Sequence, residues 1–318
     1  MDNRIKYVDF LKGITIILMV MFHIHYVEAI QPLMKVVYSF HMPVFLFFSG
    51  YFIKFDNSLK VRLTRLVRSI VLPYIFFEIL YIISLFVAGK LGLSFQNKID
   101  ELNLYLLLNK IIIQPIGAYW YLHTVSISIS VIYLSFHFFK NKIDATIIAG
   151  FVCFLFCNLI NGLKFENCIF IIVGICFKEL NINVPFSFIS FLVFILTGTF
   201  NLASINRGSI ESLGMVLFYI SFLGWIYNKY SKYSIINVFS FLGKNTLIIV
   251  LIHPIFLNFS RITYSFFVTI ESTGILYLVF ASVLTIFLSI FCSYILDKLK
   301  LSKLLFGKNI YVKFSSTR

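Results

Sequence analysis

Charged residues are scarce in this sequence. Lys, Arg, Asp and Glu together make up 13% of its 318 residues, whereas hydrophobic residues make up 60% and the mean hydropathy is +0.94. A soluble globular domain needs far more polar surface than this composition supplies. The composition therefore excludes a soluble protein and predicts an all-α, polytopic membrane protein.

Two further shortages narrow the functional class. The 13 acidic residues are outnumbered by 27 basic ones, for a formal net charge of +14, but no clustered basic face of a soluble domain accompanies this charge, so nucleic acid is not an expected partner. The five cysteines lie in apolar runs without CxxC spacing. They are expected to be packing residues, and neither a disulfide framework nor a metal site is predicted.

Apolar runs of about twenty residues, the length that crosses a bilayer, predict about ten transmembrane helices. The expected spans are 8–27, 34–55, 69–89, 117–139, 143–162, 166–178, 185–202, 209–228, 239–259 and 275–296. With a cytoplasmic N-terminus, seven of the 27 Lys and Arg fall in outer loops and the other 20 on the cytoplasmic side. This asymmetry predicts that both termini are cytoplasmic and that residues 1–318 form one transmembrane domain with no soluble domain. Residues 90–116 are the longest connection, expected to hold an interfacial or re-entrant helix.

The first expected span, "DFLKGITIILMVMFHIH", carries Asp9, Lys12 and His23. Ionisable groups inside a bilayer are costly unless they face a partner or a wet cavity. Lys12 and His23 are three helical turns plus about 20° apart, so they share one face, separated by about 16 Å along the axis. Asp9 precedes Lys12 by three residues and can pair with it. Histidine is suited to taking and returning a proton near neutral pH.

The next two spans add further polar groups. His41, in the second span, is expected at a depth similar to that of His23. Arg62, Arg65 and Arg68 recur at every third position on the cytoplasmic side, where they could bind phosphate or simply satisfy the positive-inside rule. Glu78 lies well inside the third span. It is expected to orient a histidine, to pair with a base, or to sit protonated against a hydroxyl.

Five segments in order resemble the integral-membrane acyltransferase family 3, especially its sugar O-acetylase branch, similar to fucose O-acetylases. The segments are "YVDFLKGITIILMVMFH", "SFHMPVFLFFSGYF", "RLTRLVRSIVLPY", "YWYLHT" and "LGKNTLIIVLIHPIF". The first contains a basic residue, ten intervening residues and a histidine, Lys12 to His23. "YWYLHT" departs from the family pattern by placing Tyr121 where Phe is common. The resemblance covers essentially the full length.

The resemblance implies an O-acyltransferase of the bacterial plasma membrane that uses cytoplasmic acetyl-CoA as the acetyl donor. The implied acceptor is a hydroxyl of a cell-surface polysaccharide, such as a capsule or exopolysaccharide, or of its lipid-linked precursor. His23 is then the reactive group, as a base or as the acyl carrier, with His41 or Glu78 orienting it or sharing its proton. The expected donor-binding residues are Lys12, Arg62, Arg65, Arg68, Lys244 and Asn245. The expected acceptor-binding residues are Trp120, Tyr121 and His253. For Trp120 and Tyr121 an aromatic belt at the outer interface is the alternative. The oligomeric state is left open.

The main competing hypothesis is a transporter or flippase for a lipid-linked glycan, in which the buried polar groups line a path. Such folds often contain inverted repeats, and none is visible between the two halves of the sequence. A non-catalytic scaffold or sensor is a further alternative, which would tolerate loss of His23.

Overall fold

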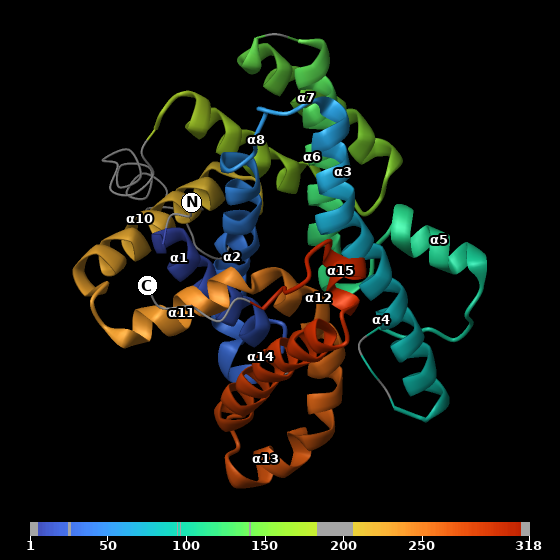
Figure 1. The fold of residues 1–318 in the computed structure, drawn as a ribbon. Helices are drawn as coiled ribbons and strands as arrows, with labels where there is room; N and C mark the ends of the chain where they lie inside the picture. Colours follow the sequence, from blue (N-terminus) through green and yellow to red (C-terminus); the bar gives the residue numbers. More distant parts are fainter. Residues whose placement is uncertain are drawn as a thin grey trace.

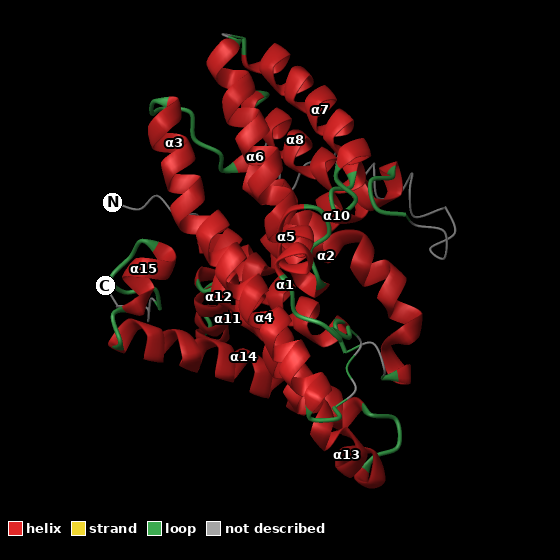
Figure 2. Ribbon diagram, turned by 90° about the vertical axis from the view of Figure 1, so that its right-hand side faces the viewer, coloured by secondary structure: helices red, strands yellow, loops and turns green. Residues whose placement is uncertain are grey.

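The computed structural model describes residues 6–24, 27–93, 95, 97–139, 141–182 and 206–312. These residues form helices and no strand (Figure 2), which confirms the all-α prediction. The elements are α1 (Lys6–Phe22), η1 (Glu28–Ile30), α2 (Gln31–Tyr51), α3 (Leu59–Leu66), η2 (Val67–Val71), α4 (Leu72–Lys90), α5 (Leu104–Ile112), η3 (Gly117–Tyr119), α6 (Trp120–Phe138), α7 (Lys142–Leu159), α8 (Phe165–Glu179), α10 (Ile210–Tyr230), α11 (Ser234–Lys244), α12 (Thr246–Ser260), η5 (Arg261–Thr263), α13 (Tyr264–Ile270), α14 (Ile275–Lys298) and α15 (Leu301–Phe306).

Seven helical segments of the described chain are long and apolar enough to cross a membrane. They are Glu28–Tyr51, Leu59–Lys90, Gly117–Phe138, Lys142–Leu159, Ile210–Tyr230, Thr246–Ile270 and Ile275–Lys298. Two expected spans correspond to shorter helices, α1 with 17 residues and α8 with 15. The expected span 185–202 lies outside the described residues. The structure is therefore that of a polytopic membrane protein.

The expected span 239–259 is wrong as a single helix. Lys244 ends α11, and Asn245 leaves the helical conformation with φ −110° and ψ 16° before α12 begins at Thr246. The Asn245 side-chain amide donates to the carbonyl oxygen of Phe241 at 2.9 Å, which closes the last turn of α11. The apolar run continues on both sides of this break, so hydropathy alone did not reveal it. After the break, α12 continues through η5 and α13 as far as Ile270.

Helix α1 lies in the middle of the bundle, where it packs on α2, α10, α11, α12 and α14 (Figure 1). Its closest neighbour is α11, because glycine lets the two backbones touch. A Cβ atom built on Gly13 would lie 1.8 Å from the carbonyl oxygen of Phe239, and one on Gly243 would lie 1.7 Å from that of Asp9. A reciprocal pair, Gly50 and Gly174, joins α2 to α8 in the same way. Small residues at such crossings are typical of helix packing in membranes.

We expect Gly13→Ala to lower the melting temperature of the purified protein by at least about 5 °C, because the methyl group would force α1 away from α11. Gly89→Ala is the matched control. A Cβ atom there would meet only the Ile99 carbonyl oxygen at 3.7 Å, an ordinary contact, so its melting temperature should stay within about 2 °C of the parent, since alanine is also the better helix former. Equal melting temperatures for the two variants would contradict the close crossing of α1 and α11.

One helix carries both the arginine segment and the third expected span. Residues Leu59–Lys90 run continuously through α3, η2 and α4 (Figure 2), and the five residues of η2 form a turn of π-helix. Turns of this kind inside α-helices are frequent at functional sites. The arginine segment therefore continues directly into a membrane helix, and the combined helix Leu59–Lys90 lines both cavities described next.

Candidate active site

Two cavities open between the helices of the bundle, and they share no lining residue. The histidine cavity has a volume of about 270 Å³ and is lined by His23, Tyr38, His41, Met42, Tyr81, Asn97, Gly117, Ala118, Trp120, Arg207, His253, Pro254, Leu257 and Asn258. The arginine cavity has a volume of about 430 Å³. Its polar lining comprises Lys12, Ser49, Lys54, Asn57, Arg62, Arg65, Ser69, Tyr121, Tyr133 and Thr246. Helices α2, α6 and α12 contribute to both, while α1 contributes Lys12 to the arginine cavity and is followed directly by His23 in the histidine cavity.

Three histidines from three different helices meet in the histidine cavity. The ring of His23, the residue directly after α1, lies 6.3 Å from that of His41 on α2 and 5.3 Å from that of His253 on α12, measured between ring centres. His23 and His41, which were expected at a similar depth, therefore also lie close together. His253 completes a cluster of imidazoles at one end of α1.

Each of these histidines is held in the same way by its own helix. The Nδ1 atom lies 2.5 Å from the Met19 carbonyl oxygen in His23, 2.7 Å from that of Val37 in His41, and 2.9 Å from that of Ile249 in His253. Because a carbonyl can only accept, each Nδ1 must carry a hydrogen, so in the neutral form of the ring Nε2 holds the lone pair. For His41 and His253, Nε2 is buried and has no hydrogen-bond partner among the described residues.

The histidine cavity also contains a cation, Arg207, from the expected outer loop between spans 185–202 and 209–228. The Arg207 guanidinium lies over Trp120 at 5.1 Å and over Tyr38 at 5.7 Å from the ring centres, and its Nε donates to the Tyr38 carbonyl oxygen at 3.3 Å. Burial lowers the pKa of Arg207 below its usual value, while nearby Glu166 acts in the opposite direction. The group stays protonated because an arginine pKa starts far above neutral.

Neutral polar groups complete the histidine cavity. The Asn258 side-chain amide donates to the Tyr81 hydroxyl at 3.3 Å, and Asn97 lines the cavity from the connection before α5. The sequence analysis singled out none of Tyr38, Tyr81, Asn97 and Asn258. A signal was present for Asn258 alone, since an amide stands five residues after His253 in a run that is otherwise apolar.

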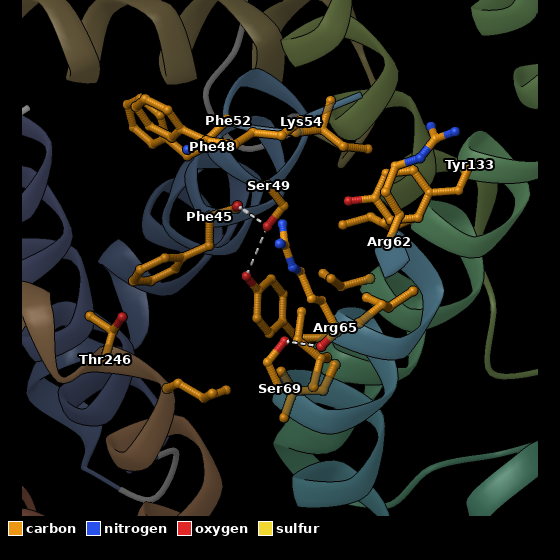
Figure 3. Close-up of a pocket in the computed structure, with 18 of the residues that line it drawn as sticks. Phe45, Phe48, Ser49, Phe52, Lys54, Arg62, Arg65, Ser69, Tyr133 and Thr246 are labelled. Carbon is orange, nitrogen blue, oxygen red and sulfur yellow. Dashed lines mark hydrogen bonds between the residues drawn. The ribbon is translucent and has the colours of Figure 1, made fainter. Parts of the chain in front are cut away.

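In the arginine cavity, four cations line a space that is otherwise mostly apolar. Arg65 extends towards Ser49, and Arg62 lies beside Tyr133 (Figure 3). The Oγ atom of Ser49 lies 3.3 Å from the Tyr121 hydroxyl. Arg62 is 8% exposed, and its Nε and Nη1 have no hydrogen-bond partner among the described residues. Lys12 enters from α1, 5.7 Å from the ring centre of Phe52. Guanidinium groups with unused donors in a concave site are suited to phosphate.

Three of the expected donor residues do not line the arginine cavity. Arg68 is absent from its walls and packs near Gly307. Each three-residue step turns an α-helix by about 60°, so Arg68 points about 120° from Arg62 even before the π-turn is considered. Lys244 and Asn245 also lie outside the walls, although Thr246, directly after them, is part of the lining.

The adjacent aromatic residues Trp120 and Tyr121 line different cavities, and their position at the outer membrane interface stays a prediction. Trp120 lines the histidine cavity and Tyr121 lines the arginine cavity. Consecutive side chains on a helix point about 100° apart, so one sequence motif serves two sites.

Glu78 lines neither cavity. It is fully buried, and its Oε1 accepts a hydrogen bond from the Ile116 amide at 2.8 Å. Ile116 precedes η3, which carries the backbone towards Trp120, so Glu78 supports one wall of the histidine cavity instead of touching a histidine. Asp9 is 2% exposed under the crossing with α11, and its pairing with Lys12 stays a prediction.

A buried apolar layer lies between the two cavities. Along α1, Ile16 and Met19 separate Lys12 from His23, and both are completely buried. Along α2, Phe45 lines the arginine cavity and Met42 the histidine cavity. These four side chains belong to one packed cluster. Among the residues described, no group of three or more His, Cys, Asp or Glu is arranged to hold a metal ion.

Comparison with known proteins agrees with this arrangement. A family model described as an acyltransferase domain matches residues 5–294, nearly the whole chain. No curated protein and no solved structure matches the chain. The two cavities, the cations in one and the imidazoles in the other, therefore belong to a multi-pass membrane acyltransferase, and the chain is a member of acyltransferase family 3.

Proposed function

We propose that the protein transfers acetyl from cytoplasmic acetyl-CoA to a hydroxyl of a cell-surface polysaccharide or of its lipid-linked precursor in the bacterial plasma membrane. One observation carries the proposal: helices α2, α6 and α12 line both a cationic cavity and an imidazole cavity. Buried apolar side chains of α1 lie between Lys12 in the first cavity and His23 in the second. A polyanionic donor and a polyhydroxylated acceptor need such different surroundings. The resemblance to sugar O-acetylases favours acetyl as the group transferred.

In the arginine cavity, Arg65, Arg62 and Lys12 bind the phosphates of CoA through charge-assisted hydrogen bonds. The thin pantetheine arm then passes between α1, α2 and α6 towards the histidine cavity. This passage requires side chains of the apolar layer, above all Met19 and Met42, to change rotamer. Methionine is suited to this because its side chain is unbranched and flexible.

In the histidine cavity, the Nε2 lone pair of His23 takes the proton of the acceptor hydroxyl. The oxygen attacks the thioester carbonyl, the carbon–sulfur bond breaks, and the proton returns to the CoA thiolate, so the products are an ester and free CoA. In the covalent alternative Nε2 attacks the thioester carbonyl and the CoA thiolate leaves. The sugar oxygen then attacks the acyl-imidazole carbonyl, the imidazole leaves, and the hydroxyl proton passes to the CoA thiolate. The Nε2 atoms of His41 and His253 accept hydrogen bonds from further sugar hydroxyls, and Trp120 stacks on the sugar ring.

The experiment uses the full chain in lipid nanodiscs with acetyl-CoA and glycans from a strain that lacks the gene. We expect free CoA thiol and acetylated glycan to appear in equal amounts. In intact cells, deletion should remove an O-acetyl resonance from the NMR spectrum of the surface glycan. Intact thioester together with an unchanged glycan spectrum would refute the proposal and favour the transporter, which moves a glycan without consuming acetyl-CoA.

A further inference from the structure

Arg207 brings a permanent positive charge into a cavity otherwise lined by neutral polar, apolar and imidazole groups. Among the described residues that line the histidine cavity, none is Asp or Glu. One carboxylate acts on it electrostatically, that of Glu166 on α8, which approaches the backbone of Gly208 and is not part of the lining. Among the described residues of the lining, the cation therefore has no carboxylate beside it.

The guanidinium is fixed before any ligand arrives. The guanidinium carbon lies 5.1 Å from the ring centre of Trp120 and 5.7 Å from that of Tyr38, within cation–π distance, and the Tyr38 carbonyl oxygen accepts a hydrogen bond from Nε. Two cation–π contacts and one backbone hydrogen bond restrict the rotamers of this long side chain, so less entropy is lost when the remaining donors are used. This is the arrangement of a preorganised binding group.

A neutral sugar does not account for such a group. Holding a partly desolvated cation in a membrane protein is unfavourable unless a counter-charge compensates for the lost hydration. Sugar hydroxyls can be bound by the neutral amides Asn97 and Asn258, which line the same cavity. An oxyanion in the cavity supplies a counter-charge that no described lining residue provides, and it matches the planar donors of arginine.

We propose that the acceptor carries an oxyanion and that Arg207 binds it, so that a neighbouring hydroxyl is placed at His23. The inference rests on the acyl-transfer function proposed above and narrows its acceptor to an anionic glycan. Two sources share this chemistry, the carboxylate of an acidic sugar and the diphosphate of a lipid-linked glycan. Arg207 is a specificity-determining residue and takes no part in bond making.

The test uses the organism's own glycans, so the acceptor need not be known. Glycans from the deletion strain are separated by anion exchange and solvent extraction into neutral, carboxylate-bearing and diphospholipid-linked pools. Each pool is incubated with the full chain in nanodiscs and radiolabelled acetyl-CoA. We expect label in one of the two anionic pools, and which pool is labelled identifies the source of the oxyanion.

The variants Arg207→Gln, Arg207→Lys and Arg261→Gln are compared on the labelled pool. Arg207→Gln should raise the acceptor KM at least tenfold while the acetyl-CoA KM stays within twofold, and Arg207→Lys should recover part of the loss. Arg261 is exposed and lies outside the cavity lining, so Arg261→Gln should match the parent.

Label in the neutral pool, or an Arg207→Gln variant that matches the parent, would overturn the anionic acceptor while leaving acyl transfer intact. Intact acetyl-CoA with every pool would refute acyl transfer itself, and the inference would be rejected with it. The pool that the parent protein labels gives an answer even if Arg207→Gln does not fold.

Discussion

Alanine in place of His23 is expected to lower the rate of acyl transfer by about 10³-fold, within the range of 10²–10⁴ that a positioned general base contributes. The imidazole is the reacting group in both the direct and the covalent route, so both are lost together. The measurement is the rate of free CoA thiol formation by the full chain in nanodiscs. The reaction contains saturating acetyl-CoA and, as acceptor, the glycan pool from the deletion strain that the parent protein labels. Folding is followed by the melting temperature of each preparation.

His137→Ala is the matched control for this prediction. His137 lies in the last turn of α6, is exposed and lines neither cavity, so its removal should leave the rate within twofold of the parent. A His23→Ala variant that melts normally and turns over at the parent rate would remove His23 from the chemistry. If His253→Ala alone abolished turnover, the reacting imidazole would instead be the one that faces His23 across 5.3 Å.

Alanine in place of Arg65 is expected to raise the KM and the dissociation constant for acetyl-CoA by about 10- to 100-fold, as the loss of hydrogen bonds to a charged group predicts. Arg65 lines the arginine cavity and extends towards its centre (Figure 3). The turnover rate at saturating donor should change little, because the phosphates lie far from the bond that breaks. Isothermal titration with acetyl-CoA and steady-state kinetics measure the two constants separately.

Arg68→Ala provides a control on the same helix, three residues further along and with the same change of charge. Arg68 does not line the cavity, so the constants for acetyl-CoA should stay within twofold of the parent. If these arginines served only to orient the protein in the membrane, Arg65→Ala and Arg68→Ala would change the KM and the dissociation constant for acetyl-CoA equally. A larger effect at Arg68 than at Arg65 would place the donor elsewhere.

Much of the helical architecture could be predicted from hydropathy, because a bilayer forces each apolar run to satisfy its backbone within one helix. The similar depth of His23 and His41 was also predicted from the sequence, whereas their proximity came from the structure. They lie in consecutive spans expected to be antiparallel, at similar distances from the connection, and helical rise converts sequence position into depth. Local periodicity was sufficient in both cases.

What could not be predicted depends on rotation and on contacts between distant segments. The separation of Tyr121 from Trp120 and of Arg68 from Arg65 reflects how far each helix is turned about its axis, which packing decides. The close approach of Gly243, near the end of α11, to the backbone of Asp9 joins residues more than two hundred positions apart in the chain. Arg207 enters the cavity from a connection that carries no periodicity.

The crossing of α1 and α11 restricts how the catalytic cycle can proceed. Lys12 lies on α1 and His23 directly follows it, and Gly13, next to Lys12, leaves no room for a side chain between α1 and the backbone of α11. In the proposed mechanism, the donor-binding Lys12 and the reactive His23 would therefore keep a nearly constant separation. The acyl arm of the donor would then cross the apolar layer while α1 stays in place, so the proposed transfer does not require alternating access.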